Sequence, residues 1–306
     1  MLDVILPVFA LVALGAALRG RLGLGEGAEL GRLLYWVALP AQLLHLTART
    51  DLAHGLPWAA AAVIAVVVAL GMAAMLLLTR RLDPGVRGSL ANGAMRPNGA
   101  FIGLPIIQLA AQQLDVISGG ALLGAYVLVL GPAVIVFNLG AVMAFRWPHH
   151  GGGFLGAVAE LPRNPILVSC AVGTALGAWR PGLLEGTVPG AALAMVAACA
   201  VPLALITAGL GLDLAVLRGR LGWLSLTTLA KLLIQPTAAW GACRVLGLDH
   251  ATTAAVTILM ASPAAMAAVP MARAMGGDPA LMAALVTATT LLAPLTLYAW
   301  LALVLR

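Results

Sequence analysis

Charged side chains are scarce in this sequence. Lysine, arginine, aspartate and glutamate together make up 9% of its 306 residues, whereas a typical soluble domain contains about 25%. Hydrophobic residues account for 62%, and the mean hydropathy is +1.04. The scarcity of charge excludes an ordinary soluble domain and is typical of a protein that crosses a lipid bilayer several times.

The sequence also lacks the clusters that metal sites, disulfides and nucleic-acid interfaces need. Its three cysteines, Cys170, Cys199 and Cys243, are isolated in apolar segments and show no metal-ligand spacing. The net charge is +6, but the basic residues are spread thinly over connecting segments rather than along one stripe. We therefore expect no metal, no cofactor and no nucleic acid as a partner.

Motifs for intramembrane catalysis are missing as well. The chain has no His-Glu-x-x-His zinc motif and no buried serine–histidine arrangement. We therefore expect that it is not an enzyme. No carboxylate lies plainly in the middle of an apolar segment, which argues against a proton- or sodium-coupled mechanism that needs a buried acid.

Ten apolar segments are present, each close to the roughly 20 residues that a spanning helix needs. They are 3–19, 28–47, 57–78, 88–111 and 117–145 in the first half, and 164–179, 189–212, 221–246, 251–275 and 279–305 in the second. The expected fold class is an all-α membrane protein with ten transmembrane helices.

The two halves of the chain resemble each other. Residues 37–40 (VALP) are matched by 199–202 (CAVP), and Gly131-Pro132 is matched by Ala293-Pro294. Each half contains five spans, an odd number, so the second half must enter the membrane from the opposite side. We therefore predict two inverted five-helix repeats, 1–146 and 164–306, joined by a cytoplasmic linker at 147–163.

Corresponding segments of the two halves are interrupted by paired prolines. The interruptions are 95–105 (MRPNGAFIGLP) and 260–270 (MASPAAMAAVP). Proline breaks helices, and broken backbone at membrane depth persists only where it is buried in protein or lines a wet cavity. Matched breaks point to the substrate site of a transporter. Freed amides, half-helix N-termini and the Asn98 side chain would favour an anion there.

Three ionisable residues near or within these spans have more than one interpretation. Arg96 borders the first break, where it either attracts an anion or braces the backbone. Lys231 either provides charge near an anion path, bonds carbonyls freed at a helix break, or snorkels to an interface. His45 either relays a proton or is a packed histidine.

Several motifs resemble one known family. They are 96–105 (RPNGAFIGLP), 163–165 (RNP), 37–40 followed by His45, 231–236 (KLLIQP), and 262–290. Together they resemble the auxin efflux carrier family, which includes plant carriers and bacterial malate-permease-like proteins. The resemblance covers nearly the whole chain and implies that the fourth and ninth helices cross at their breaks. It places the substrate carboxylate at this crossing, with the family's substrate-binding asparagine at Asn98 and its second crossover proline at Pro263. Together with the freed backbone of the breaks, this predicts a substrate site at Pro97, Asn98, Gly99, Gly103, Pro105, Pro263, Ala264 and Pro270.

The resemblance also implies a division of labour among the helices. Helices 1, 2, 6 and 7 would form a scaffold and a homodimer interface, and helices 3–5 and 8–10 would move as a transport unit in an elevator-type cycle. The long central loop of plant carriers is absent here. More arginines follow odd-numbered spans than even-numbered ones, which favours both termini outside. The composition favours a multi-pass protein of the bacterial inner membrane.

These observations predict a secondary transporter of small organic anions, namely carboxylates. One alternative is a cation/proton antiporter or a sodium-coupled bile-acid-type symporter of similar inverted-repeat fold. An alternative outside transport is a membrane sensor that binds its ligand without moving it.

Overall fold

The structure is a computed structural model that describes residues 2–19, 21, 28–49, 57–150, 165–180, 182–217 and 221–305. All regular secondary structure in these residues is helical, apart from one isolated bridge between two residues. Four helices are both long and apolar enough to cross a membrane: Trp58–Leu78, Ser118–Pro148, Val188–Leu210 and Pro279–Val304. The all-helical, multi-pass membrane class expected from the sequence is therefore confirmed.

The helices follow the apolar segments in chain order. The first half contains α1 (Leu2–Leu18), α2 (Ala28–Leu33), η1 (Leu34–Ala38), α3 (Leu39–Thr47), α4 (Trp58–Leu78), α5 (Pro84–Met95), η2 (Gly99–Gly103), α6 (Leu104–Gln112) and α7 (Val116–His150). The second half contains α9 (Pro165–Trp179), α10 (Val188–Leu210), η4 (Leu214–Leu217), α11 (Leu221–Leu229), η5 (Ala230–Ile234), α12 (Gln235–Val245), α13 (His250–Ala261), α14 (Ala268–Ala274) and α15 (Pro279–Val304). Helix α7 continues into residues 147–150, where the linker was expected to begin, and 151–164 lie outside the described residues.

Three wide π-helical turns precede prolines. The turns η1, η2 and η5 end two residues before Pro40, Pro105 and Pro236, respectively. A proline ring clashes with the carbonyl four residues earlier and has no N–H for the helical ladder. In a π-helical turn each N–H bonds to the carbonyl five residues earlier. The turn is therefore wider, which moves the clashing carbonyl away from the proline ring. Pro40, Pro105 and Pro236 therefore widen their helices, whereas Pro97 and Pro263 lie at the interruptions themselves.

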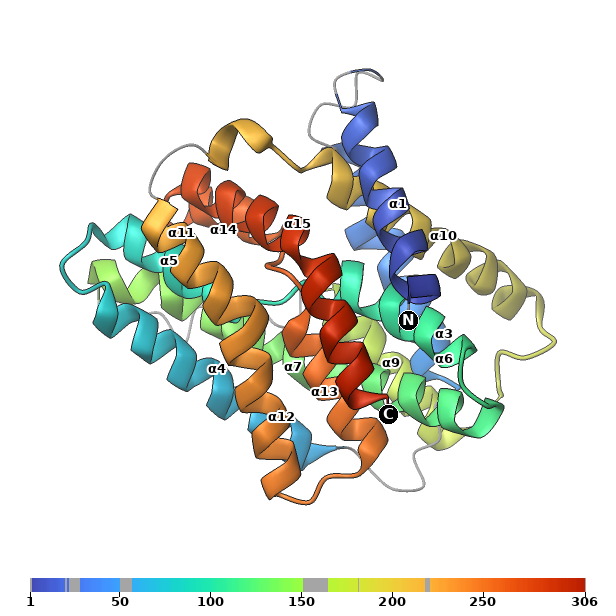
Figure 1. Cartoon of the computed structure of the whole chain (residues 1–306). Helices are drawn as coiled ribbons and strands as arrows, with labels where there is room; N and C mark the ends of the chain where they lie inside the picture. Colours follow the sequence, from blue (N-terminus) through green and yellow to red (C-terminus); the bar gives the residue numbers. More distant parts are fainter. Residues whose placement is uncertain are drawn as a thin grey trace.

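The helices pack in two groups. Helix α1 packs along α10, and α3 packs against α9 and α10, whereas α4, α5, α7, α12, α13 and α15 pack against one another. Figure 1 shows α1 and α10 together on one side of the molecule and α4, α5 and α12 on the other, with α15 between them. The second group therefore contains both interrupted helices.

The segments that lead into the breaks are the most enclosed parts of this second group. Every residue of 88–95 in α5 and of 253–261 in α13 is buried. A helix without a polar face can be buried on all sides by its neighbours. The two breaks are therefore held at the centre of the packed helices.

The two leading helices begin differently. The Asp249 carboxylate caps α13 by accepting the N–H of Thr252 at 2.9 Å, whereas Asp83 makes no side-chain cap to α5. Burial acts to raise the pKa of Asp249, but hydrogen bonds from the Thr252 side chain and from nearby backbone amides outweigh it and hold the pKa below its usual value. The ionised form of Asp249 therefore caps α13 more strongly than the protonated form.

Candidate functional site

The two helix breaks meet and pair through their backbones. The N–H of Asn98 donates to the carbonyl of Pro263 at 2.7 Å, and the N–H of Ala265 donates to the carbonyl of Arg96 at 3.0 Å. Pro97 and Ala264 lie between these bonds as an antiparallel bridge. Two segments far apart in the sequence thus form a minimal piece of sheet, which satisfies groups that the prolines removed from the helical ladder.

Neighbouring helices satisfy further backbone groups of the breaks. The N–H of Ala264 donates to Thr289 Oγ1 of α15 at 3.0 Å, and the hydroxyl of Tyr126 on α7 donates to the carbonyl of Gly99 at 2.9 Å. The carbonyl of Asn98 accepts from Ile102 and Gly103, both at 3.1 Å. Much of the freed backbone is therefore committed to internal bonds rather than open to a ligand.

The first turn of η2 is the exception. The N–H groups of Gly99, Ala100 and Phe101 have no acceptor within the helix, as at any helix start. These three residues line a cavity of about 70 Å³ beside the first break. Its wall consists of Tyr35, Arg96, Pro97, Asn98, Gly99, Ala100, Phe101, Leu130, Val134, Phe137, Asn138, Ala265 and Ala267. The space equals about two water molecules.

The polar lining of this cavity is rich in donors. The Arg96 guanidinium donates to Asn138 Oδ1 of α7 at 2.9 Å and lies 2.8 Å from the sulfur of Met271 on α14. It pairs with no carboxylate among the described residues. The side-chain amide nitrogens of Asn98 and Asn138 are buried, and neither has an acceptor in the described part of the chain. One cation and two unused amide donors therefore border the same small space.

Two glycines of the signature allow close packing at the break. A Cβ at Gly103 would lie 2.1 Å from the Tyr126 hydroxyl oxygen and 2.6 Å from the Ser262 hydroxyl oxygen. A Cβ at Gly99 would lie 2.2 Å from a methyl of Leu259. Both distances are shorter than non-bonded atoms tolerate. Glycine is therefore needed at these two positions because the neighbouring side chains leave no room for a Cβ. Gly103 is buried and does not line the cavity.

Lys231 lies behind the breaks rather than in the cavity. Its side chain is fully buried, and Nζ donates to the Met260 carbonyl at 2.6 Å and to Gln235 Oε1 at 2.8 Å. Gln235 Nε2 donates in turn to the Met95 carbonyl at 3.1 Å. Of the interpretations open for Lys231, bonding to carbonyls freed at a helix break is the one seen here, and its complete burial excludes snorkelling.

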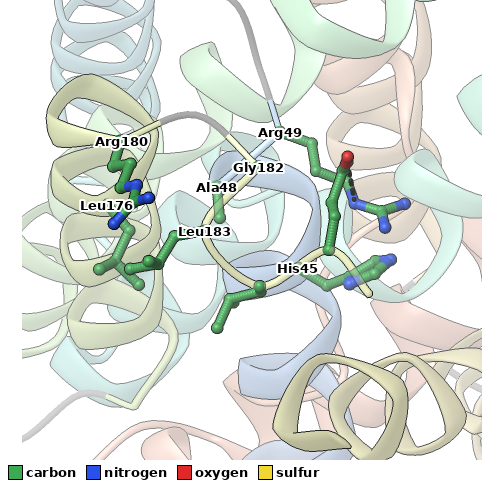
Figure 2. Close-up of a pocket in the computed structure, with 9 residues that line it drawn as sticks. His45, Ala48, Arg49, Leu176, Arg180, Gly182 and Leu183 are labelled. Atoms are coloured by element: carbon green, nitrogen blue, oxygen red, sulfur yellow. Dashed lines mark ion pairs between the residues drawn. The ribbon is translucent and has the colours of Figure 1, made fainter. Parts of the chain in front are cut away.

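His45 and the outer prolines lie elsewhere. Figure 2 shows His45 near Arg49, whose Nε forms an ion pair with Glu185 Oε1 at 3.5 Å. His45 and Pro105 line a separate cavity of about 680 Å³ and not the one at Asn98. Pro270 lies inside α14 and is also away from the small cavity. The structure thus gathers Arg96, Pro97, Asn98 and Gly99 and leaves His45, Pro105 and Pro270 apart.

Two larger cavities lie between the two helix groups. The cavity of about 680 Å³ has walls from α1, α3, α6, α7 and α10, and Gln42 Nε2 donates across it to Gln108 Oε1 at 3.3 Å. The other, of about 480 Å³, is bordered by Arg19, which pairs with Asp213 at 3.0 Å, and reaches Met266 and α14. One cavity approaches the helix after the first break, and the other approaches the helix after the second.

Sequence reasoning left the role of Asn138 open and did not connect Tyr35 with this site. Asn138 is a single amide in the apolar α7, and Tyr35 comes from η1 in the other helix group. A single amide side chain in a spanning segment indicates a polar partner or a ligand nearby, because an unpaired polar group is costly there. Nothing in the spacing of Tyr35 would have connected it with Asn98.

Comparisons with known proteins agree with a transport role. Residues 157–301 match a family described as membrane transport protein. An uncharacterized transporter from Methanothermobacter thermautotrophicus is 28% identical over 305 residues, covering 97% of this chain and 96% of that protein. Together, the family match and this relative support a membrane transport protein and agree with the resemblance of the motifs to the auxin efflux carrier family.

Proposed function

We propose that this protein is a secondary transporter of small organic anions and that it binds the carboxylate of its substrate at the paired helix breaks. The observation that carries the proposal is Arg96, a guanidinium in a cavity at a broken helix that has no carboxylate partner among the described residues. An uncompensated charge in a low-dielectric interior is costly. A bound anion would remove that cost.

The surrounding donors suit a carboxylate. The unused amide nitrogens of Asn98 and Asn138 border the same cavity as Arg96, and charge-assisted hydrogen bonds are the stronger kind. The helix that starts at Gly99 and continues through α6 directs its positive end toward the break. Phe101, Val134 and Phe137 provide apolar walls for the remainder of the substrate.

The contacts between helices support the inverted repeat. The pair α1–α10 corresponds to α9–α3 when the halves are exchanged, and α5–α7 corresponds to α13–α15. The pair α4–α5 likewise corresponds to α12–α13. We propose ten spans in two inverted five-helix repeats, with α2, η1 and α3 forming the second span and α11, η5 and α12 the eighth.

The two helix groups suggest how the substrate is exposed to each side in turn. We propose that α1, α3, α9 and α10 form the scaffold and that the remaining helices move against it as an elevator. The two large cavities between the groups approach the breaks from different sides and are candidates for the alternating access paths. We further propose that the protein forms a homodimer through the scaffold. It would lie in the bacterial inner membrane, with both termini on the outer side.

The proposal is tested with purified protein, first by binding and then by flux. Wild type is screened for thermal stabilisation by acetate, pyruvate, benzoate, succinate and malate, because a ligand of the folded state raises Tm. Arg96→Gln is expected to weaken binding by at least a hundredfold. Arg80→Gln, at an exposed position after α4, removes the same charge and is expected to bind like wild type.

Uptake of the bound carboxylate into reconstituted vesicles separates a transporter from a sensor, which would bind without flux. Dependence of uptake on an imposed sodium gradient would favour the sodium-coupled alternative. Equal binding by wild type and Arg96→Gln would contradict the proposed site.

A further inference from the structure

The carbonyls that precede the two breaks are joined by one pair of side chains. Lys231 Nζ donates to the carbonyl of Met260, next to the last residue of α13. Gln235 Nε2 donates to the carbonyl of Met95, the last residue of α5. Since Lys231 also donates to Gln235 Oε1, a continuous chain of hydrogen bonds links α13 to α5 through η5 and the start of α12.

The positive charge of Lys231 is opposite in sign to the two helix ends that Lys231 and Gln235 bond between them. The C-terminus of a helix carries the equivalent of about half a negative charge, so the ends of α5 and α13 together amount to about one. Lys231 forms no ion pair with a described carboxylate. Its side chain is completely buried, bonds the end of α13 directly and is linked to the end of α5 through Gln235.

We propose that Lys231 and Gln235 form a brace that fixes the two half-helices relative to each other and so positions the bridge between the breaks. The bridge consists of the Asn98–Pro263 and Ala265–Arg96 bonds. Without the brace, two negative helix ends would repel at close range and two carbonyls would lose their donors. Lys231 and Gln235 are thus positioning residues and do not touch the substrate.

The π-helical turn explains how one helix can reach both ends. Pro236 widens the helix at η5, and Lys231 lies within that wide turn whereas Gln235 directly follows it. Trp300 of α15 donates from Nε1 to the carbonyl of Leu232 at 3.0 Å and so supports the same turn without contacting a break. This difference provides a matched control.

The brace is tested by hydrogen–deuterium exchange of the purified protein. In Lys231→Met, the amides of Asn98 and Ala265 are expected to exchange at least tenfold faster than in wild type. Amides of α1 and α10 are expected to stay within twofold. Trp300→Phe, which also removes a buried hydrogen bond, is expected to leave Asn98 and Ala265 within twofold.

Gln235→Glu provides a second, independent variant. Glutamate can still accept from Lys231 but cannot donate to the Met95 carbonyl, and its charge neutralises the lysine. It is expected to accelerate exchange at Asn98 and Ala265 even if Lys231→Met fails to fold. Unchanged exchange at these amides, or an equal increase throughout the protein, would overturn the brace.

Binding gives a readout that separates positioning from stability. The dissociation constant of the carboxylate that stabilises wild type is expected to rise at least tenfold in folded Gln235→Glu and to stay unchanged in Trp300→Phe. If no carboxylate binds wild type, the function proposed above fails, and exchange alone then decides on the brace.

Discussion

The two helix breaks have the same backbone design but different side chains. The first contains Arg96, Asn98 and two glycines, whereas the second, 261–269, contains alanine, methionine, valine, proline and a single serine. The Ser262 hydroxyl donates to the Ile258 carbonyl of its own helix at 2.9 Å. The first break therefore provides the side chains that could bind a ligand, whereas the second pairs with the backbone of the first and holds it in place.

The largest effect is expected at Gly103, where the first break packs against Tyr126 and Ser262. Gly103→Ala places a Cβ against the Tyr126 and Ser262 oxygens, both of which are held by hydrogen bonds. Overpacking of this kind costs about 2–3 kcal/mol of unfolding free energy. Gly71→Ala in α4 meets no atom within 4 Å and is the control. Chemical denaturation in detergent measures both, and equal stability of the two variants would refute the close contact.

A smaller effect is expected on binding. Asn98→Ala removes a buried amide donor at the cavity, and Ser262→Ala removes a hydroxyl of the second break that does not line the cavity. We expect Asn98→Ala to weaken carboxylate binding about tenfold, about 1.4 kcal/mol, and Ser262→Ala to leave it unchanged. Calorimetric titration of both purified variants measures the difference. Similar losses in the two would show that the breaks contribute alike.

The support from α15 is specific to the second break. Thr289→Val is nearly isosteric but leaves the buried N–H of Ala264 without its acceptor, which costs about 1 kcal/mol of stability. Thr296→Val, whose hydroxyl bonds only carbonyls of its own helix, is the control. Thermal unfolding is expected to shift for Thr289→Val and not for Thr296→Val. A shift of the same size in both would assign the loss to the helix alone.

The smallest effect concerns the start of the helix that leads into the second break. Because the folded pKa of Asp249 is lowered, its cap stabilises the protein above the unfolded pKa of about 4 and is lost as the pH falls through the folded value. Asp249→Asn still caps but does not titrate there. Its Tm is therefore expected to fall less than that of wild type between pH 6 and pH 3. Parallel curves would exclude the cap as a pH-sensitive element.

Local rules predicted the helices and their interruptions. Pro97 and Pro263 lie where their spans are interrupted, because the proline ring removes a donor and clashes with the preceding turn. Pro105 and Pro270 lie inside the helices that follow. Long apolar runs likewise predict helices regardless of their neighbours. The sequence also indicated that Arg96 and Lys231 are important, because ionisable residues in such apolar segments usually have a structural or functional role.

Contacts between distant segments could not be predicted in the same way. Asn138 lies in a different helix from Arg96, and nothing in the periodicity of α7 reveals which residue its amide faces. The three interpretations of Lys231 were equally compatible with its neighbours in sequence. Only the position of Met95 and Met260 carbonyls relative to η5 distinguishes them.

The membrane class, the helical segments and the candidate interruptions follow from composition and from residues close together in the chain. Only the folded chain shows that the two breaks pair with each other, that the first borders a cavity rich in donors, and that Lys231 and Gln235 join the two helix ends. Those outcomes depend on which buried polar groups meet, and the partners of such groups come from segments that are far apart in the sequence.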